Sequence, residues 1–197
     1  MSRSRLFGRP GIRMSVRMRA VPLSLLALLL PVAAMAQAGK PAPKPAVASA
    51  AAATPAPKAI GAFGEWQAAT YDEGGQKVCY AFTKARSSTP KVPGRGEAVL
   101  TVTQRVSLRD AVALSAGFDF ATNAAVEVLV DKAKFEFYTA KRSGFARDGH
   151  AVIAELQTAK MVTVHAPHPQ KKTLTDTFGL KGFGQAYEAI NKACPPK

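Results

Sequence analysis

The sequence contains three histidines, and two of them stand at a spacing that a metal site can use. His165 and His168 are three residues apart, while His150 stands alone. A zinc site needs three or four closely placed His, Cys, Asp or Glu ligands. Pro167 and Pro169 flank the pair, and no nearby cysteine or carboxylate completes a set. We therefore expect solvated loop histidines and no metal site, with a zinc site as the alternative.

No motif for nucleophilic catalysis is present. The chain has neither G-x-S-x-G nor H-E-x-x-H, the patterns that place a nucleophile or a metal beside its base. Ser88 and Lys91 match S-x-x-K, but Pro90 and Pro93 indicate a loop rather than the helix start which that motif requires. Asp72–Glu73 is typical of a turn and not of an acid/base pair. We expect no catalytic residue and no cofactor.

The chain has two cysteines, Cys79 and Cys194. In an oxidising compartment two thiols usually pair, and no C-x-x-C motif indicates redox chemistry. A bridge would close a loop of more than one hundred residues, which in the chain-entropy model stabilises the fold by roughly 4–5 kcal/mol. We predict a structural disulfide, with two free buried thiols as the alternative.

Two segments combine positive charge with loop composition, at residues 84–97 and 168–173. Long loops in compact domains are often functional. Their candidate binding cations are Arg86, Lys91 and Arg95 in the first segment and Lys171 and Lys172 in the second. If the loops meet at one end of the fold, they form a basic patch. The alternative is that both are solvated loops without a ligand.

The N-terminus predicts export. Six arginines and no acidic residue lie between residues 3 and 19, an apolar run covers residues 20–34, and small residues follow. This order is typical of a secretory signal peptide. We assign residues 1–38 to it, with cleavage after Ala36 or Ala38. The apolar run is shorter than the ~20 residues of a membrane span, and an uncleaved anchor is the alternative.

Translation starts at Met1, Met14 or Met18, and the later starts give a better proportioned signal. Without an Arg-Arg pair or a cysteine at the cleavage region, we expect neither twin-arginine export nor lipid modification. The expected location is the periplasm, envelope-associated or secreted.

Charge must be counted after cleavage. Six of the 27 basic residues lie in the signal, which leaves 21 against 13 acidic residues, a net charge of +8. Nucleic-acid binding proteins cluster basic residues along one element, and this chain does not, so we expect no nucleic-acid partner. An unknown envelope protein or an anionic envelope polymer is a better match to a moderately basic surface.

Residues 39–59 consist almost wholly of Ala, Pro and Lys and have no aromatic residue. Such a segment cannot repay its ordering entropy, so we predict a disordered linker that serves as a leader tail or as a tether. Residues 60–197 are then one domain, large enough for a genuine core.

Short segments of alternating apolar and polar residues dominate this domain and predict about eight strands. They cover residues 66–71, 77–83, 98–106, 111–120, 126–130, 134–138, 161–166 and 173–180. Asp148 is a candidate N-cap for a helix over 149–160, and a C-terminal helix over 184–194 stops at Pro195. We predict an antiparallel β-sandwich or barrel with two short helices.

The order of several motifs resembles the invasion-associated locus B family of exported bacterial proteins, over nearly all of residues 64–195. The motifs are Trp66, Lys-Val-Cys-Tyr-Ala at 77–81, Leu-Thr-Val-Thr at 100–103, Phe-Glu-Phe-Tyr-Thr at 135–139, Arg-Ser-Gly-Phe-Ala-Arg-Asp-Gly at 142–149, Asp-Thr-Phe-Gly-Leu-Lys-Gly-Phe at 176–183 and Ala-Cys-Pro at 193–195. The resemblance implies an immunoglobulin-like β-sandwich in the periplasm or envelope, without a catalytic set. Many members carry one cysteine pair in the first hairpin and another before the first helix. Neither pair is present here, which favours pairing of Cys79 with Cys194.

We therefore expect an exported, monomeric, non-catalytic binding module. The alternatives are a hydrolase that acts on an envelope polymer and a secreted surface factor for host-cell entry.

Overall fold

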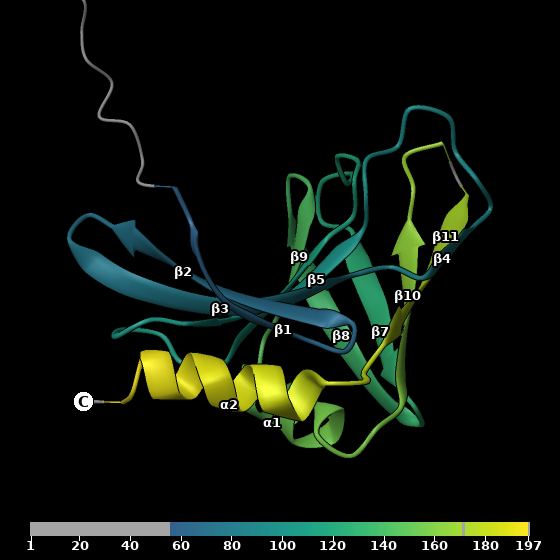
Figure 1. The fold of residues 1–197 in the computed structure, drawn as a ribbon. Coiled ribbons are helices and arrows are strands. Elements are labelled where there is room, and N and C mark those ends of the chain that lie inside the picture. The colour runs from purple at the N-terminus through teal and green to yellow at the C-terminus, as the bar shows by residue number, and fades with distance from the viewer. Residues whose placement is uncertain (1–55, 171, 197) are drawn as a thin grey trace, which may run out of the picture. The chain divides into compact units, whose positions relative to one another are not determined.

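The computed structural model describes residues 56–170 and 172–196, which belong to one compact unit (Figure 1). The predicted signal peptide and most of the predicted linker lie outside the described residues. Within them, no helix is long and apolar enough to cross a membrane. The first strand begins at Lys58, so the last two residues of the predicted linker belong to the sheet.

Eleven strands form one antiparallel sheet. They are β1 (Lys58–Phe63), β2 (Trp66–Glu73), β3 (Gln76–Lys84), β4 (Ser87–Thr89), β5 (Val99–Gln104), β6 (Ala111–Ser115), β7 (Ala125–Val130), β8 (Ala133–Ala140), β9 (Ser143–Ala146), β10 (Met161–Pro167) and β11 (Thr173–Gly179). Their order is β1-β2-β3-β5-β6-β9-β8-β7-β10-β11-β4. All eight predicted strands are present, and β1, β4 and β9 were not predicted.

The sheet curls back on itself. β4 follows β3 after two residues, yet it lies at the opposite end of the strand order. The curl is closed by hydrogen bonds from the Trp66 Nε1–H to the Gly179 carbonyl at 3.1 Å and from the Arg86 N–H to the Thr177 carbonyl at 2.8 Å. Figure 1 shows the β1–β3 part crossing the part that holds β7, β10 and β11. The predicted class is confirmed: a mainly antiparallel β fold with two helices, one C-terminal, consistent with a β-sandwich.

The two helices cover the inner face of the curled sheet. In α1 (Gly149–Leu156), the Asp148 side chain accepts a hydrogen bond from the Ala151 N–H at 3.0 Å, as its N-cap prediction requires. The helix ends at Leu156, earlier than the predicted residue 160. In α2 (Phe183–Ala193), Gly182 adopts φ +90° at the N-cap, where a Cβ would stand 2.0 Å from the Phe63 carbonyl oxygen.

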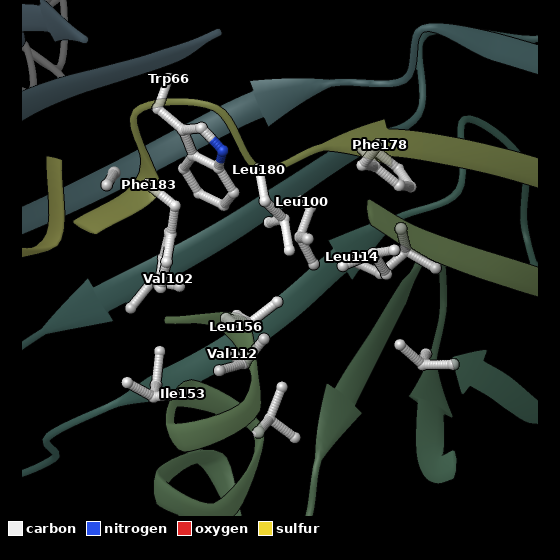
Figure 2. Close-up of a cluster of buried hydrophobic side chains, with 14 of the residues drawn as sticks. Trp66, Leu100, Val102, Val112, Leu114, Ile153, Leu156, Phe178, Leu180 and Phe183 are labelled. Atoms are coloured by element: carbon white, nitrogen blue, oxygen red, sulfur yellow. The ribbon is translucent and has the colours of Figure 1, made fainter. Parts of the chain in front are cut away.

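The core lies between the helices and the sheet (Figure 2). Trp66 and Phe183 are both fully buried, with ring centroids 4.8 Å apart. Ile153 and Leu156 of α1 point into the same cluster. Cys79 of β3 and Cys194, directly after α2, form a disulfide with a Cα–Cα distance of 5.9 Å. The bridge fastens the C-terminal helix to the sheet, and the predicted pairing is confirmed.

Candidate functional site

The two predicted basic loops lie side by side at one end of the sheet (Figure 1). The first, predicted over residues 84–97, covers the end of β3, all of β4 and most of the β4–β5 connection, and the second connects β10 to β11. β4 pairs with β11 in the register Ser87↔Thr177 and Thr89↔Thr175. The chain that leaves β4 after Thr89 therefore runs beside the chain that enters β11 at Thr173. Strand pairing thus brings together two segments that are about eighty residues apart in the sequence.

Arg95 is buried beneath this end and does not face a ligand. Its guanidinium forms a two-point ion pair with Asp176, with Nη1–Oδ1 at 2.8 Å and Nη2–Oδ2 at 2.5 Å. The two side chains are 6% and 0% exposed. Nε donates to the Ala116 carbonyl at 2.8 Å, and the guanidinium lies 5.4 Å from the centroid of the Phe118 ring. Arg95 is a structural residue of the loop, which corrects its assignment as a binding cation.

Arg86 is also paired, although its side chain is exposed. Nε and Nη2 both donate to the Glu65 carboxylate, and this hydrogen bonding holds the pKa of Glu65 below its ordinary value. Arg86 immediately precedes β4 and lies away from the loop tip. It is therefore not a free cation of the basic patch, contrary to the sequence-based assignment.

Four cations remain at this end, and we call them the basic end: Lys91, Lys141, Arg142 and Lys172. All four are exposed, and none has a carboxylate partner within 4.0 Å among the described residues. Lys91 and Lys172 were predicted. Lys171 lies outside the described residues.

Sequence reasoning missed Lys141 and Arg142, which form the tight turn between β8 and β9. Their carbonyls accept hydrogen bonds from the Phe120 N–H at 2.8 Å and the Ala116 N–H at 2.9 Å, so the turn is fastened to the β6–β7 connection. Lys141 adopts φ +52°. An adjacent basic pair a few residues after the strand predicted over 134–138 was the available signal.

Close backbone contact joins the β4–β5 loop to the β6–β7 connection, and a contact between two rings joins that connection to the β10–β11 loop. The Gly96 N–H donates to the Gly117 carbonyl at 3.0 Å. Gly117 adopts φ +77°, and a Cβ there would stand 2.1 Å from the Gly96 carbonyl oxygen. The Phe118 ring packs edge-on against His168, with centroids 4.6 Å apart.

A hollow of about 510 Å³, lined by residues 119–123 and 139–141, opens beside Lys141.

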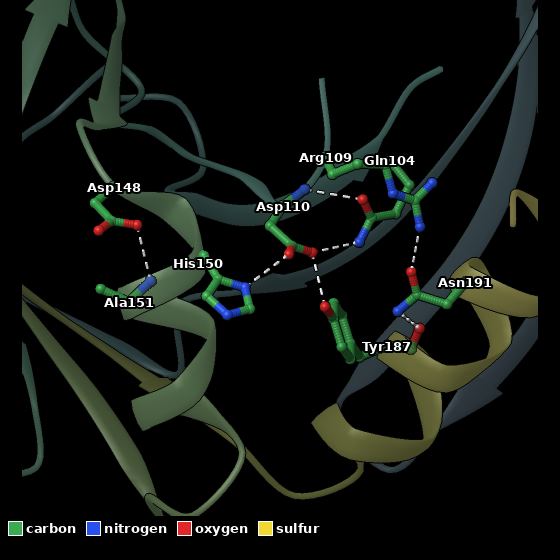
Figure 3. Close-up of polar contacts among 8 residues, drawn as sticks. All are labelled: Gln104, Arg109, Asp110, Asp148, His150, Ala151, Tyr187 and Asn191. Carbon is green, nitrogen blue, oxygen red and sulfur yellow. Dashed lines mark hydrogen bonds and ion pairs between the residues drawn. The ribbon is translucent and has the colours of Figure 1, made fainter. Parts of the chain in front are cut away.

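A second polar cluster surrounds Asp110, in the connection between β5 and β6 (Figure 3). Its Oδ1 accepts from Gln104 Nε2 at 2.6 Å and from the Tyr187 hydroxyl at 2.7 Å. His150 Nδ1 lies 3.2 Å from Oδ2. Burial raises the pKa of Asp110, but the hydrogen bonds from Gln104, Tyr187 and His150 outweigh burial and leave that pKa below its ordinary value. The cluster ties α1 and α2 to the end of β5.

In this cluster His150 and Asp110 are paired as the base and the orienting carboxylate of a catalytic triad are, but the nucleophile of a triad is missing among the described residues. His150 has an 86% exposed side chain, and among the described residues no hydroxyl or thiol hydrogen-bonds to it. Ser88 lies in β4 and not in a loop. The remaining histidines are half-buried rather than solvated: His165 faces the Thr175 hydroxyl at 3.2 Å from β10, and His168 contacts Phe118. No group of three or more His, Cys, Asp or Glu in the described part of the chain could hold a metal ion.

Comparison with known proteins gives one family. The family model described as invasion associated locus B (IalB) protein matches residues 66–191, which include all four residues of the basic end. Among solved structures, the crystal structure of invasion associated protein B from Bartonella henselae is similar, with 19% sequence identity and a TM-score of 0.49. That similarity covers 68% of this chain and 95% of the other. No curated protein matches the chain.

Proposed function

The chain belongs to the invasion associated locus B family, and from that premise we propose that it is an exported, non-catalytic binding protein of the cell envelope. The signal-like N-terminus and the Cys79–Cys194 disulfide support export into an oxidising compartment. The family description names an association with invasion and no reaction. Binding, rather than turnover, is therefore the activity for which we propose a site.

The exposed, unpaired cations of the basic end carry the proposal. On a protein surface, cations without carboxylate partners raise the local positive potential. They attract anionic partners over about one Debye length, ~8 Å at physiological salt. Elsewhere on the described domain, several exposed cations are neutralised within the fold, as Lys84 is by Glu97 and Lys134 by Glu127. The partner we propose is an anionic envelope polymer or the acidic face of an envelope protein.

The buried ion pair beneath the loops supports this assignment. Arg95 and Asp176 hold the β4–β5 loop on β11, and the Gly96–Gly117 backbone contact holds it on the next connection. A preorganised loop loses less conformational entropy on binding, which increases affinity without added contacts. Lys91 on an ordered loop therefore binds a polyanion better than it would on a flexible one.

The hydrolase alternative has weaker support. Hydrolysis of a glycan by the usual route needs two carboxyl groups facing one bond, whereas the hollow at the basic end is lined by one carboxylate, Asp119. The His150–Asp110 pair lacks an adjacent nucleophile. A surface factor for host-cell entry would use the same cations outside the cell, and protection from protease added to intact cells would argue against it.

Charge reversal tests the site. At 0.15 M salt, the Lys91→Glu/Lys172→Glu variant should bind immobilised dextran sulfate and washed envelope fractions at least tenfold more weakly than wild type does. Its matched control is Lys132→Glu/Lys160→Glu, which makes the same charge change at the opposite end of β8 and before β10. Equal losses in the two variants would show that net charge alone drives binding. Unchanged binding of the first variant would remove the basic end as the site.

A further inference from the structure

The described domain exposes four large hydrophobic side chains, and three of them belong to one region. Val106, Leu108, Tyr138 and Met161 are 50%, 54%, 44% and 43% exposed. Leu108 and Tyr138 line the same cavity, of about 240 Å³. Val106 lies in the same turn as Leu108, which the Arg105 N–H closes by donating to the Leu108 carbonyl at 2.9 Å. Clustered exposed apolar side chains mark interaction sites more often than isolated ones do.

The sheet provides the floor and one wall of this cavity. Ala111 and Ala113 face outward from β6, since Val112 and Leu114 between and beyond them are buried. Phe145 of β9 is the register partner of both Ala113 and Tyr138. The Phe145 and Tyr138 rings lie together, with centroids 5.5 Å apart. Small residues beside two aromatic rings leave a groove on the outer face of the sheet.

The opposite wall is the rigid turn that carries Leu108. Asp110 holds this turn on β5 and α2 through Gln104 and Tyr187, as Figure 3 shows. Arg109 donates to the Cys194 carbonyl at 2.7 Å and to Asn191 Oδ1 at 2.5 Å. The turn is therefore fastened on both sides while Leu108 stays exposed to solvent.

The rim of the groove is cationic. The Arg147 guanidinium lies 5.4 Å from the centroid of the Tyr138 ring and has no carboxylate partner within 4.0 Å among the described residues. Two carboxylates lie nearby: Asp110 lines the cavity and accepts from Gln104 and Tyr187, and Asp148 caps α1. Arg109 also lines the cavity, so its lining carries two positive charges and one negative charge, and a ligand carboxylate would meet Arg147 directly.

We propose that the groove formed by Leu108, Ala111, Tyr138, Phe145 and Arg147 is a docking site for an extended segment of a partner protein that presents an apolar side chain beside a carboxylate. The cavity is smaller than the 300–1,000 Å³ of sites for small-molecule ligands, and its size matches a single large side chain. Arg147 supplies the complementary charge for the adjacent carboxylate. This site is separate from the basic end and does not depend on the proposed function.

The test is selection of a displayed library of random octapeptides on the oxidised chain purified from cells. We expect enriched peptides to contain Leu, Ile or Phe next to Asp or Glu. Their affinities should fall at least tenfold for Leu108→Ser and for Arg147→Gln. The matched control is Met161→Ser, which removes the fourth exposed hydrophobic side chain outside the groove and should leave the affinities unchanged.

Three results would overturn the proposal. One is a selection that yields no enriched peptide, or peptides without an acidic residue. Another is that the Leu108→Ser and Arg147→Gln variants bind the enriched peptides as tightly as wild type does, while circular dichroism shows that all variants are folded. The last is that the same variants abolish self-association or binding to vesicles of anionic lipid instead, which would assign the groove to a second copy of the chain or to a membrane surface.

Discussion

Arg95 and Asp176, eighty-one residues apart, form a two-point ion pair in the interior of the domain, with Nη2–Oδ2 at 2.5 Å and side chains 6% and 0% exposed. The pair joins the β4–β5 loop to the middle of β11. It explains why the two basic loops stay together and why a cation in the middle of a basic loop is not available to a ligand.

Breaking this pair should strongly destabilise the domain. Arg95→Met leaves Asp176 buried without a partner, a change that typically costs 3–5 kcal/mol of unfolding free energy. The double variant Arg95→Met/Asp176→Leu should recover most of that loss, because neither charge stays buried. Urea unfolding followed by circular dichroism measures both. Lys84→Met, which breaks the exposed pair with Glu97, should cost no more than about 1 kcal/mol, and a similar loss in all three variants would contradict the assignment.

Removing the disulfide should lower stability by several kcal/mol. The bridge joins residues separated by 115 positions, for which chain entropy predicts about 4–5 kcal/mol. We expect Cys79→Ala/Cys194→Ala to unfold at correspondingly lower urea concentration. Reductant should destabilise the wild type and have no effect on this double variant. Two titratable thiols in the denatured, unreduced wild-type protein would show instead that the cysteines are free.

The Asp110 cluster should make stability depend on pH. The pKa of Asp110 in the fold lies below its ordinary value of 3.8, so the ionised form stabilises the folded state. That contribution is present above about pH 4 and is lost as the pH falls through the lowered pKa. Asp110→Asn should therefore destabilise at pH 7, by about 1–3 kcal/mol, and the difference from wild type should shrink below pH 4. Asp119→Asn is the control, and a difference of constant size from pH 7 to pH 3 would argue against this role of Asp110.

Two glycines should respond oppositely to alanine. At Gly149 a Cβ would stand 1.8 Å from the Asp110 carbonyl oxygen, so Gly149→Ala must displace the start of α1 and lower the melting temperature. At Gly184, inside α2, nothing lies within 4 Å of the Cβ position. Gly184→Ala should stabilise by about 0.4–1 kcal/mol, because it restricts the unfolded chain. Thermal unfolding compares the two, and destabilisation by Gly184→Ala would contradict the packing described for α2.

Much of the fold follows from local patterns in the sequence. Alternation at Val126, Val128 and Val130 predicts a strand because side chains alternate across a sheet, and these three side chains are buried in β7. β4 and β9 have three and four residues and were missed, because runs so short contain too few periods to be recognised. β1 is as long as β5 and β7, but it begins inside the segment rich in Ala, Pro and Lys, and its burial does not alternate. Of the candidate site, Lys91 and Lys172 were found. Lys141 and Arg142 were missed, because nothing in the sequence shows which turn adjoins the loops.

By itself the sequence determined the class of fold, the family resemblance and the cysteine pairing, because periodicity, motif order and the presence of only two cysteines are local or countable properties. It also predicts export, which stays a prediction. Only the tertiary structure decided which cations are free. Lys91 and Arg95 stand four residues apart in one loop, yet Lys91 is exposed and Arg95 is neutralised by Asp176. The state of a charge depends on which carboxylate the fold brings within reach, and that pairing is set by contacts between distant strands rather than by spacing along the chain.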